Sequence, residues 1–99
     1  MNKSLHTINK SPNQLALWDQ CMSALLPEDT LLLIENAVLV VTQPALLNKV
    51  KASGCKLAVL ECDLTARGLT HLTPDDLTLV NMEQFVSLTC QHDKVISWF

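Results

Sequence analysis

The sequence predicts a single α/β domain with a mostly parallel five-stranded sheet and helices on both faces. The chain has 99 residues, which is enough for one domain and too few for two. Segments with strand character alternate with segments with helical character, an order typical of parallel sheets joined by right-handed crossovers. The apolar runs at 31–34 and 57–60 have no polar face, which predicts strands covered by helices on both sides.

The first half of the chain is expected to form two strands and two helices. Residues 5–8 predict a short strand, and Ser11 with Pro12 predicts the capped start of a helix over 13–26. The buried stripe of that helix is predicted from helical spacing, with Cys21 and Leu26 beside it: Leu15, Trp18, Met22 and Leu25. A strand over 30–34 follows. Residues 39–42 fit a short extended segment or a loop, and residues 44–53 predict a second helix that ends at Gly54.

The second half is expected to form three strands and two helices. A strand over 56–61 leads to a short helix with Asp63 at its cap and Gly68 at its end. Residues 73–76 predict a turn before a strand over 77–80. Asn81 is expected to cap a helix from 82 to about 90, with Phe85, Val86 and Leu88 packing inward, and residues 95–98 predict the last strand.

The composition predicts exposed apolar surface and disfavours some partners. Hydrophobic residues make up 48% of the chain and charged residues 17%, which is more apolar than so small a domain easily hides. We therefore expect a surface for protein partners, with a well-filled single core as the simpler alternative. The net charge of −3 argues against direct binding to nucleic acid.

Location and cofactors are predicted from features that the sequence lacks. The first residues contain no apolar secretory segment, and the apolar run over 31–41 is too short to cross a membrane. A cytoplasmic protein without membrane association is therefore expected, with its four cysteines as thiols. No CxxC pair, glycine-rich phosphate loop or metalloprotease motif is present. We accordingly expect no cofactor and no metal, because Cys90 and His92 alone make a weak metal pair.

Polar residues follow the predicted strands where parallel sheets gather ligand chemistry. They are Asn9, Lys10 and Ser11 after the first strand, Glu35 and Asn36 after the second, and Cys62 and Asp63 after the third. Glu35, Glu61 and Asp63 fit acid–base chemistry, but capping and solvation explain them more simply. Lys10 and Ser11 fit an anion site, although capping explains Ser11 equally well.

Two further side chains are expected to have structural roles. His6 lies on the first strand, where a hydrogen bond at an interface is a simpler interpretation than a catalytic base. Arg67 is expected to pair with a carboxylate of its own chain or of a partner.

Four blocks of the sequence resemble the TusB/DsrH family of sulfur-relay proteins. They are residues 5–12 (LHTINKSP), 32–38 (LLIENAV), 63–69 (DLTARGL) and 85–88 (FVSL) with the closing Ser97-Trp98. Order and spacing agree over nearly the whole chain. The sequence departs from the family pattern at Asn13, where an aromatic residue is frequent, and at Asn81-Met82, where Asp-Tyr is frequent.

The resemblance implies a DsrEFH-like fold, with flavodoxin- or Rossmann-like layering, and a place in a sulfur relay. It implies a heterohexamer, a dimer of heterotrimers, with TusC-like and TusD-like subunits, and TusA- and TusE-like carriers as indirect partners. The relay would pass persulfide sulfur for 2-thiolation of the tRNA wobble uridine. Since the family places the main relay cysteine on the TusD-like subunit, this chain is expected to be largely structural, without independent enzyme activity.

Two other functions stay open at this point. One is a DsrH-like sulfur carrier in dissimilatory sulfur oxidation that uses Cys21, and the other is a self-associating α/β binding module without sulfur chemistry. The resemblance places Cys21 where some DsrH-type relatives carry a helix cysteine. A carrier thiol needs solvent access and a lowered pKa, and a buried thiol is the alternative interpretation of Cys21. Cys62 is the second carrier candidate, and Cys55 and Cys90 are expected to be core thiols.

Overall fold

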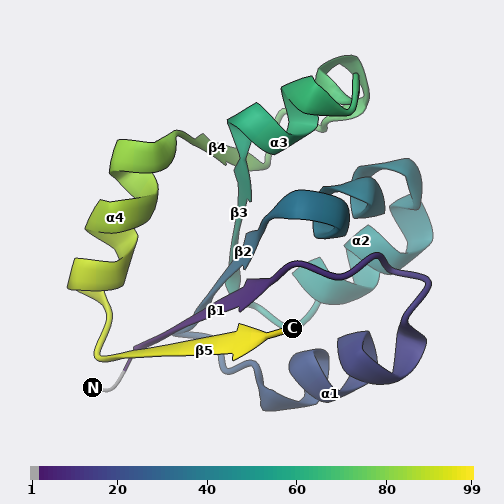
Figure 1. The fold of residues 1–99 in the computed structure, drawn as a ribbon. Coiled ribbons are helices and arrows are strands. Elements are labelled where there is room, and N and C mark those ends of the chain that lie inside the picture. The colour runs from purple at the N-terminus through teal and green to yellow at the C-terminus, as the bar shows by residue number, and fades with distance from the viewer. Residues whose placement is uncertain (1–2) are drawn as a thin grey trace.

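The computed structural model describes residues 3–99 and contains one sheet of five parallel strands (Figure 1). The strands are β1 (Ser4–Ile8), β2 (Thr30–Leu33), β3 (Lys56–Leu60), β4 (Thr78–Val80) and β5 (Lys94–Trp98). Their order across the sheet is β4-β3-β2-β1-β5, and every neighbouring pair is parallel. The predicted fold class is thus confirmed, with all rather than most strands parallel.

Four α-helices and two short 3₁₀ helices connect the strands in this part of the chain. They are α1 (Leu15–Ala24), η1 (Glu35–Thr42), α2 (Pro44–Lys51), α3 (Glu61–Ala66), η2 (Thr70–Leu72) and α4 (Met82–Gln91). Among the residues that the structure describes, no helix is long and apolar enough to span a bilayer.

The strand order explains why α4 lies alone on one face. The chain moves outward from β1 to β4 and then returns past β1 to place β5 at the opposite edge. Right-handed crossovers made in opposite directions pass over opposite faces of a sheet. Hence α1 and α2 cover one face, and α4, which carries the return connection, lies over the other (Figure 1).

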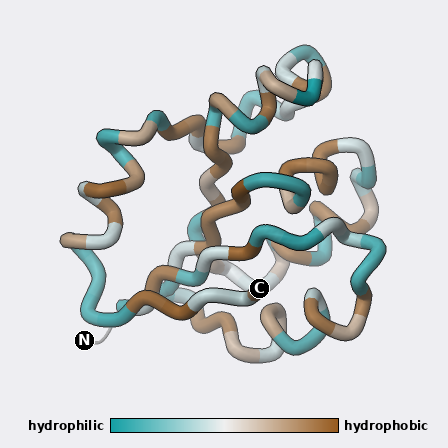
Figure 2. The backbone as a smooth tube through the Cα atoms, viewed as in Figure 1, coloured by the Kyte–Doolittle hydropathy of each residue, from teal (hydrophilic) through white to brown (hydrophobic). Residues whose placement is uncertain are grey.

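The central strand β2 separates two hydrophobic clusters. Leu31 and Leu33 pack with Trp18 of α1 and Leu47 of α2, whereas Leu32 faces the smaller cluster of the α4 side. All residues of β2 are buried, and Figure 2 shows apolar residues gathered along the middle of the sheet. The continuous apolar run thus reflects burial on both faces, as predicted.

Helix α1 differs from its prediction in its start and in its buried face. The Gln14 N–H donates to the Ser11 carbonyl and the Asn13 N–H to Ser11 Oγ, so a turn precedes the helix and Ser11 does not cap it. The Trp18 indole N–H donates to the Lys10 carbonyl. This contact turns residues 18, 21 and 25 toward the core and leaves Leu15 62% exposed; Leu26, predicted beside the stripe, is also exposed.

Residues 39–42 are neither extended nor a loop, because they continue the 3₁₀ helix η1. A 3₁₀ helix has three residues per turn, so residues three apart align. Ala37 lines up with Val40, and Val38 with Val41, and all four are buried. The apolar spacing of this segment therefore fits a buried 3₁₀ helix.

The predicted C-terminal elements are confirmed with one exception. Asn81 caps α4 in a capping box with Gln84, and Phe85 and Leu88 pack against the sheet. Val86, which was expected to pack inward, is 61% exposed. It lies on the outer side of α4 because Phe85 and Leu88, three residues apart, set the face that meets the sheet.

Candidate functional site

The predicted polar residues of the second and third strand ends meet at the carboxyl edge of the sheet. Helix α3 follows β3 directly, which places Asp63 beside the start of η1. The Glu35 N–H donates to Asp63 Oδ2 at 2.7 Å. Glu35 has a φ of 49°, in the left-handed region that costs a non-glycine residue energy. Asp63 thus stabilises a strained turn, and it lies inside the first turn of α3 rather than at its cap.

Arg67 joins the same edge from the end of α3. Its Nε and Nη2 donate to Asn36 Oδ1 at 3.3 and 3.0 Å, and its Nη1 donates to the Asp63 carbonyl at 3.2 Å. The Nη1 atom also lies 3.8 Å from Asp63 Oδ1. The expected pairing of Arg67 with a carboxylate of its own chain is confirmed, and these contacts position the loop rather than a substrate.

An open cavity of about 580 Å³ lies between α3 and the start of α4, where β3 and β4 end. Its lining residues come from both helices and the cap between them: Glu61, Cys62, Thr65, Ala66, Asn81 and Met82. The side chain of Cys62 is exposed. The solvent access that sulfur transfer requires is therefore met at Cys62.

Cys21, in contrast to the exposed Cys62, has no access to solvent. Its side chain is fully buried in the cluster under α1. Burial, followed by the electrostatic influence of the nearby Cys55, raises the pKa of Cys21 to about 12. Neither access nor a lowered pKa is provided in this structure, which favours the buried-thiol interpretation. A carrier role for Cys21 stays a prediction.

The remaining thiols differ from each other. Ser53 Oγ lies 2.7 Å from the Val50 carbonyl and 3.2 Å from Cys55 Sγ. Cys55 is half-buried, near its expected place in the core, whereas Cys90 is exposed and its predicted core position is wrong. Cys90 lies near the end of α4, whose described side chains are nowhere fully buried.

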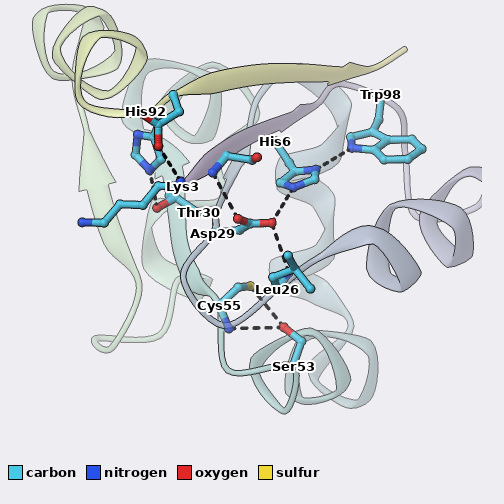
Figure 3. A network of polar contacts seen from close by, with 11 residues as sticks. Lys3, His6, Leu26, Asp29, Thr30, Ser53, Cys55, His92 and Trp98 are labelled. Atoms are coloured by element: carbon cyan, nitrogen blue, oxygen red, sulfur yellow. Dashed lines mark hydrogen bonds and ion pairs between the residues drawn. The ribbon is translucent and has the colours of Figure 1, made fainter. Parts of the chain in front are cut away.

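Of the weak metal pair predicted at the end of α4, His92 is engaged in protein contacts and Cys90 is exposed. His92 Nδ1 lies 2.6 Å from the Leu88 carbonyl. Its Nε2 lies 3.0 Å from Thr30 Oγ1 (Figure 3). Over residues 3–99, no group of three or more His, Cys, Asp and Glu side chains is arranged to hold a metal ion.

A buried polar network links β1, the start of β2 and β5 (Figure 3). His6 Nε2 lies 2.9 Å from Asp29 Oδ2, and the Trp98 indole N–H donates to His6 Nδ1 at 3.0 Å. His6 and Asp29 are 1% and 2% exposed. His6 is hydrogen-bonded, as predicted, but it lies inside its own chain because Trp98 covers it. We call His6, Asp29 and Trp98 the His6 network.

Asp29 was not singled out in the sequence. It follows a predicted helix end, and no local pattern distinguishes it from a turn residue. The only signal for the network was the presence of His6 in the first family-like block and Trp98 in the last.

The outer side of α4 carries exposed apolar side chains. Met82 and Val86, one helical turn apart, are 57% and 61% exposed; we call them the α4 patch. Val95 pairs in register with Leu5 of the α4-side cluster and is also exposed. One ten-residue helix thus leaves part of this face uncovered, as the apolar composition predicts.

Comparison with known families and proteins gives agreement over nearly the whole chain. A family model described as DsrH like protein matches residues 10–95. Protein TusB of Pectobacterium parmentieri is 30% identical over 95 residues, which cover 95% of this chain and 99% of the relative. Protein TusB of Yersinia pestis (strain Pestoides F) is 31% identical over 94 residues, with the same coverage of both chains.

Among solved structures, the crystal structure of the ychN protein from E. coli is similar. It aligns with a TM-score of 0.71 and 18% sequence identity, covering 98% of this chain and 99% of that chain. This similarity shows the fold.

Proposed function

The chain belongs to the DsrH-like protein family, and on this premise we propose that it is a subunit of a sulfur-relay complex for tRNA thiolation. The complex passes persulfide sulfur toward 2-thiolation of the wobble uridine. The observation that carries the proposal is the similarity to proteins called TusB, at about 30% identity over 95% of the chain.

Within the complex, we assign the chain a mainly structural role. TusC-like and TusD-like chains are its partners in a dimer of heterotrimers. Burial of Cys21 supports this role because a relay thiol must meet the donor and acceptor persulfides. The partly uncovered α4 side supports assembly, because exposed apolar side chains next to a sheet are typical of interfaces.

Co-expression with TusC-like and TusD-like chains tests the assembly. A tag on one partner should retain this chain, and Val86→Glu should abolish that retention by placing a charge in the α4 patch. Leu15→Glu is the matched control, because Leu15 is 62% exposed against 61% for Val86 and lies on α1, at the other face. Recovery of the wild-type chain as a lone monomer, or equal loss in both variants, would contradict the proposal.

Deletion of the gene tests the biological role. Loss of 2-thiouridine from tRNA is expected, with rescue by the wild-type chain and by Cys21→Ala. Unchanged thiolation after deletion would favour a self-associating binding module. Rescue that fails only for Cys21→Ala, with the variant folded and assembled, would instead favour a carrier role of Cys21.

A carrier role of Cys62 is the second candidate, favoured by its exposure at the cavity between α3 and α4. The Cys62 thiolate would attack the outer sulfur of a donor persulfide. The donor S–S bond breaks, the donor leaves as a thiolate, and Cys62 becomes a persulfide. Mass spectrometry should detect one added sulfur atom that Cys62→Ala removes and Cys90→Ala, an exposed control, retains. An adduct that persists in Cys62→Ala excludes this role.

A further inference from the structure

The His6 network contains enough contacts to determine where its protons lie. An indole N–H can only donate, so His6 Nδ1 must carry a lone pair toward Trp98 at 3.0 Å. A neutral imidazole has one N–H, which is therefore on Nε2 and points to Asp29 Oδ2 at 2.9 Å. The two rings are inclined by 13° with centroids 6.2 Å apart, a geometry compatible with a hydrogen bond between ring edges.

Asp29 is the charged acceptor of this arrangement. Its Oδ1 accepts from the Ser4 N–H and its Oδ2 from the Leu26 N–H, in addition to His6. Burial by itself raises the pKa of Asp29, but the hydrogen bonds from His6, Ser4 and Leu26 outweigh it and lower the pKa. Asp29 thus remains ionised and accepts the hydrogen bond from His6 Nε2–H at neutral pH.

Protonation of His6 changes the two sides of the network differently. Nε2–H keeps its bond to Asp29, which becomes charge-assisted. Nδ1 gains a proton and can no longer accept from Trp98, so two donors face each other where one hydrogen bond had been. The Trp98 indole must then move away from His6.

Trp98 is the last residue of β5, an edge strand that pairs, among residues 3–99, with β1 alone. The other end of β5 is attached separately, because Lys3 and Asp93 exchange hydrogen bonds there. Near Trp98 the additional side-chain contact is the 3.3 Å bond from Thr7 Oγ1 to Ser97 Oγ. The Trp98–His6 bond is therefore the main polar side-chain attachment of the carboxyl end of β5.

We propose that His6 is a proton-dependent attachment point for β5: the neutral imidazole holds Trp98, and the protonated imidazole releases it. The change is confined to the carboxyl end of β5, since Lys3 and Asp93 hold the other end in both states. This proposal rests on contacts within the chain and does not depend on the sulfur-relay assignment.

Among residues 3–99, no other titratable group around His6 forms a hydrogen bond with Trp98, so none takes the place of His6 in holding it. Asp29, beside β2, is its ionised contact. From β5, Lys94 lies on the same face as His6 but is exposed. The thiols on this face are Cys21 of α1, with its raised pKa, and Cys55 after α2.

Nuclear magnetic resonance of the wild-type protein tests the proposal without a substitution. Long-range proton–nitrogen correlations should place the His6 proton on Nε2 at pH 7.5. On acidification of the folded protein, the Trp98 indole resonance should move with the same midpoint as the resonances of the His6 ring. The Trp18 indole, which donates to the Lys10 carbonyl, should not follow that midpoint.

Hydrogen exchange then measures release of the strand. After correction for intrinsic rates, amides near Trp98 should exchange about fivefold faster once His6 is protonated, the factor expected for loss of one hydrogen bond. Trp98→Phe keeps an aromatic ring and removes the donor, so exchange should be fast both before and after acidification. His71→Gln, a substitution in exposed η2, should retain the wild-type response.

Three results would overturn the proposal. One is a proton on Nδ1 at pH 7.5. Another is protonation of His6 without movement of the Trp98 indole resonance. The third is a His6 ring that stays neutral until the whole protein unfolds in acid.

Discussion

In the folded protein, Cys21 should react with iodoacetamide about thirty to fifty times more slowly than a freely exposed thiol. Burial raises its pKa from the ordinary value of 9.0 to about 12. At pH 8 this lowers the thiolate fraction about a thousandfold, and the greater nucleophilicity of a more basic thiolate recovers about twentyfold. The chemistry alone therefore leaves a factor of about fifty.

Access gives a second estimate of the same effect. The Cys21 side chain is fully buried between α1 and the sheet, so the reagent reaches sulfur only after α1 opens locally. In the open state the thiol is hydrated and its pKa returns toward the ordinary value, so the two factors do not multiply. An opening free energy of about 2 kcal/mol by itself slows the reaction about thirtyfold.

Pulse labelling followed by peptide mapping gives the rate for each cysteine in one sample. Cys62 and Cys90 are exposed internal references, and all four cysteines should react at similar rates in 8 M urea. Labelling of Cys21 within tenfold of Cys62 under folding conditions would refute the reasoning. A persulfide found on Cys21 of the folded chain after incubation with a donor would refute it as well.

Three predictions concern stability, each measured by urea unfolding followed by circular dichroism. Asp29→Asn should cost about 2–4 kcal/mol at pH 7, because the buried carboxylate accepts three hydrogen bonds. The folded-state pKa of Asp29 lies below its unfolded value. The stability that the ionised carboxylate contributes is therefore present above the unfolded pKa of about 3.9 and is lost as the pH falls through the folded pKa. A stability difference between wild type and Asp29→Asn that does not shrink on acidification would contradict this pH dependence. Leu33→Ala should cost about 2–5 kcal/mol, because Leu33 is fully buried; a cost below about 1 kcal/mol would show that the site collapses. Gly68→Ala should cost about 1 kcal/mol through its φ of 65° alone, since no atom lies within 4 Å of an added Cβ; Gly68→Asn should cost less, and the reverse order would exclude backbone strain as the cause.

The family-like blocks were only partly interpretable from the sequence. Asn36, Asp63 and Arg67 lie in two of them. The contacts of Arg67 with Asn36 and of Asp63 with Glu35 join these blocks in space. The first and last blocks meet through His6 and Trp98, which are 92 residues apart. Sequence spacing marks such residues but cannot pair them, because the pairing depends on which strands become neighbours.

The amino-acid pattern determined the elements that depend on local chemistry. These local signals each act within a few residues: apolar runs long enough for buried strands, the Asn81 cap and the glycines that end helices. The five strands and their helices could therefore be predicted from the amino-acid pattern. Tertiary structure decided which helix face is buried. Cys21 rather than Leu15 faces the core because the Trp18–Lys10 contact sets the rotation of α1, and Val86 faces outward because one short helix covers the second face of the sheet. The role of Asp29 also arose only on folding, since its hydrogen-bond partners come from β1, from the end of α1 and, through His6, from β5.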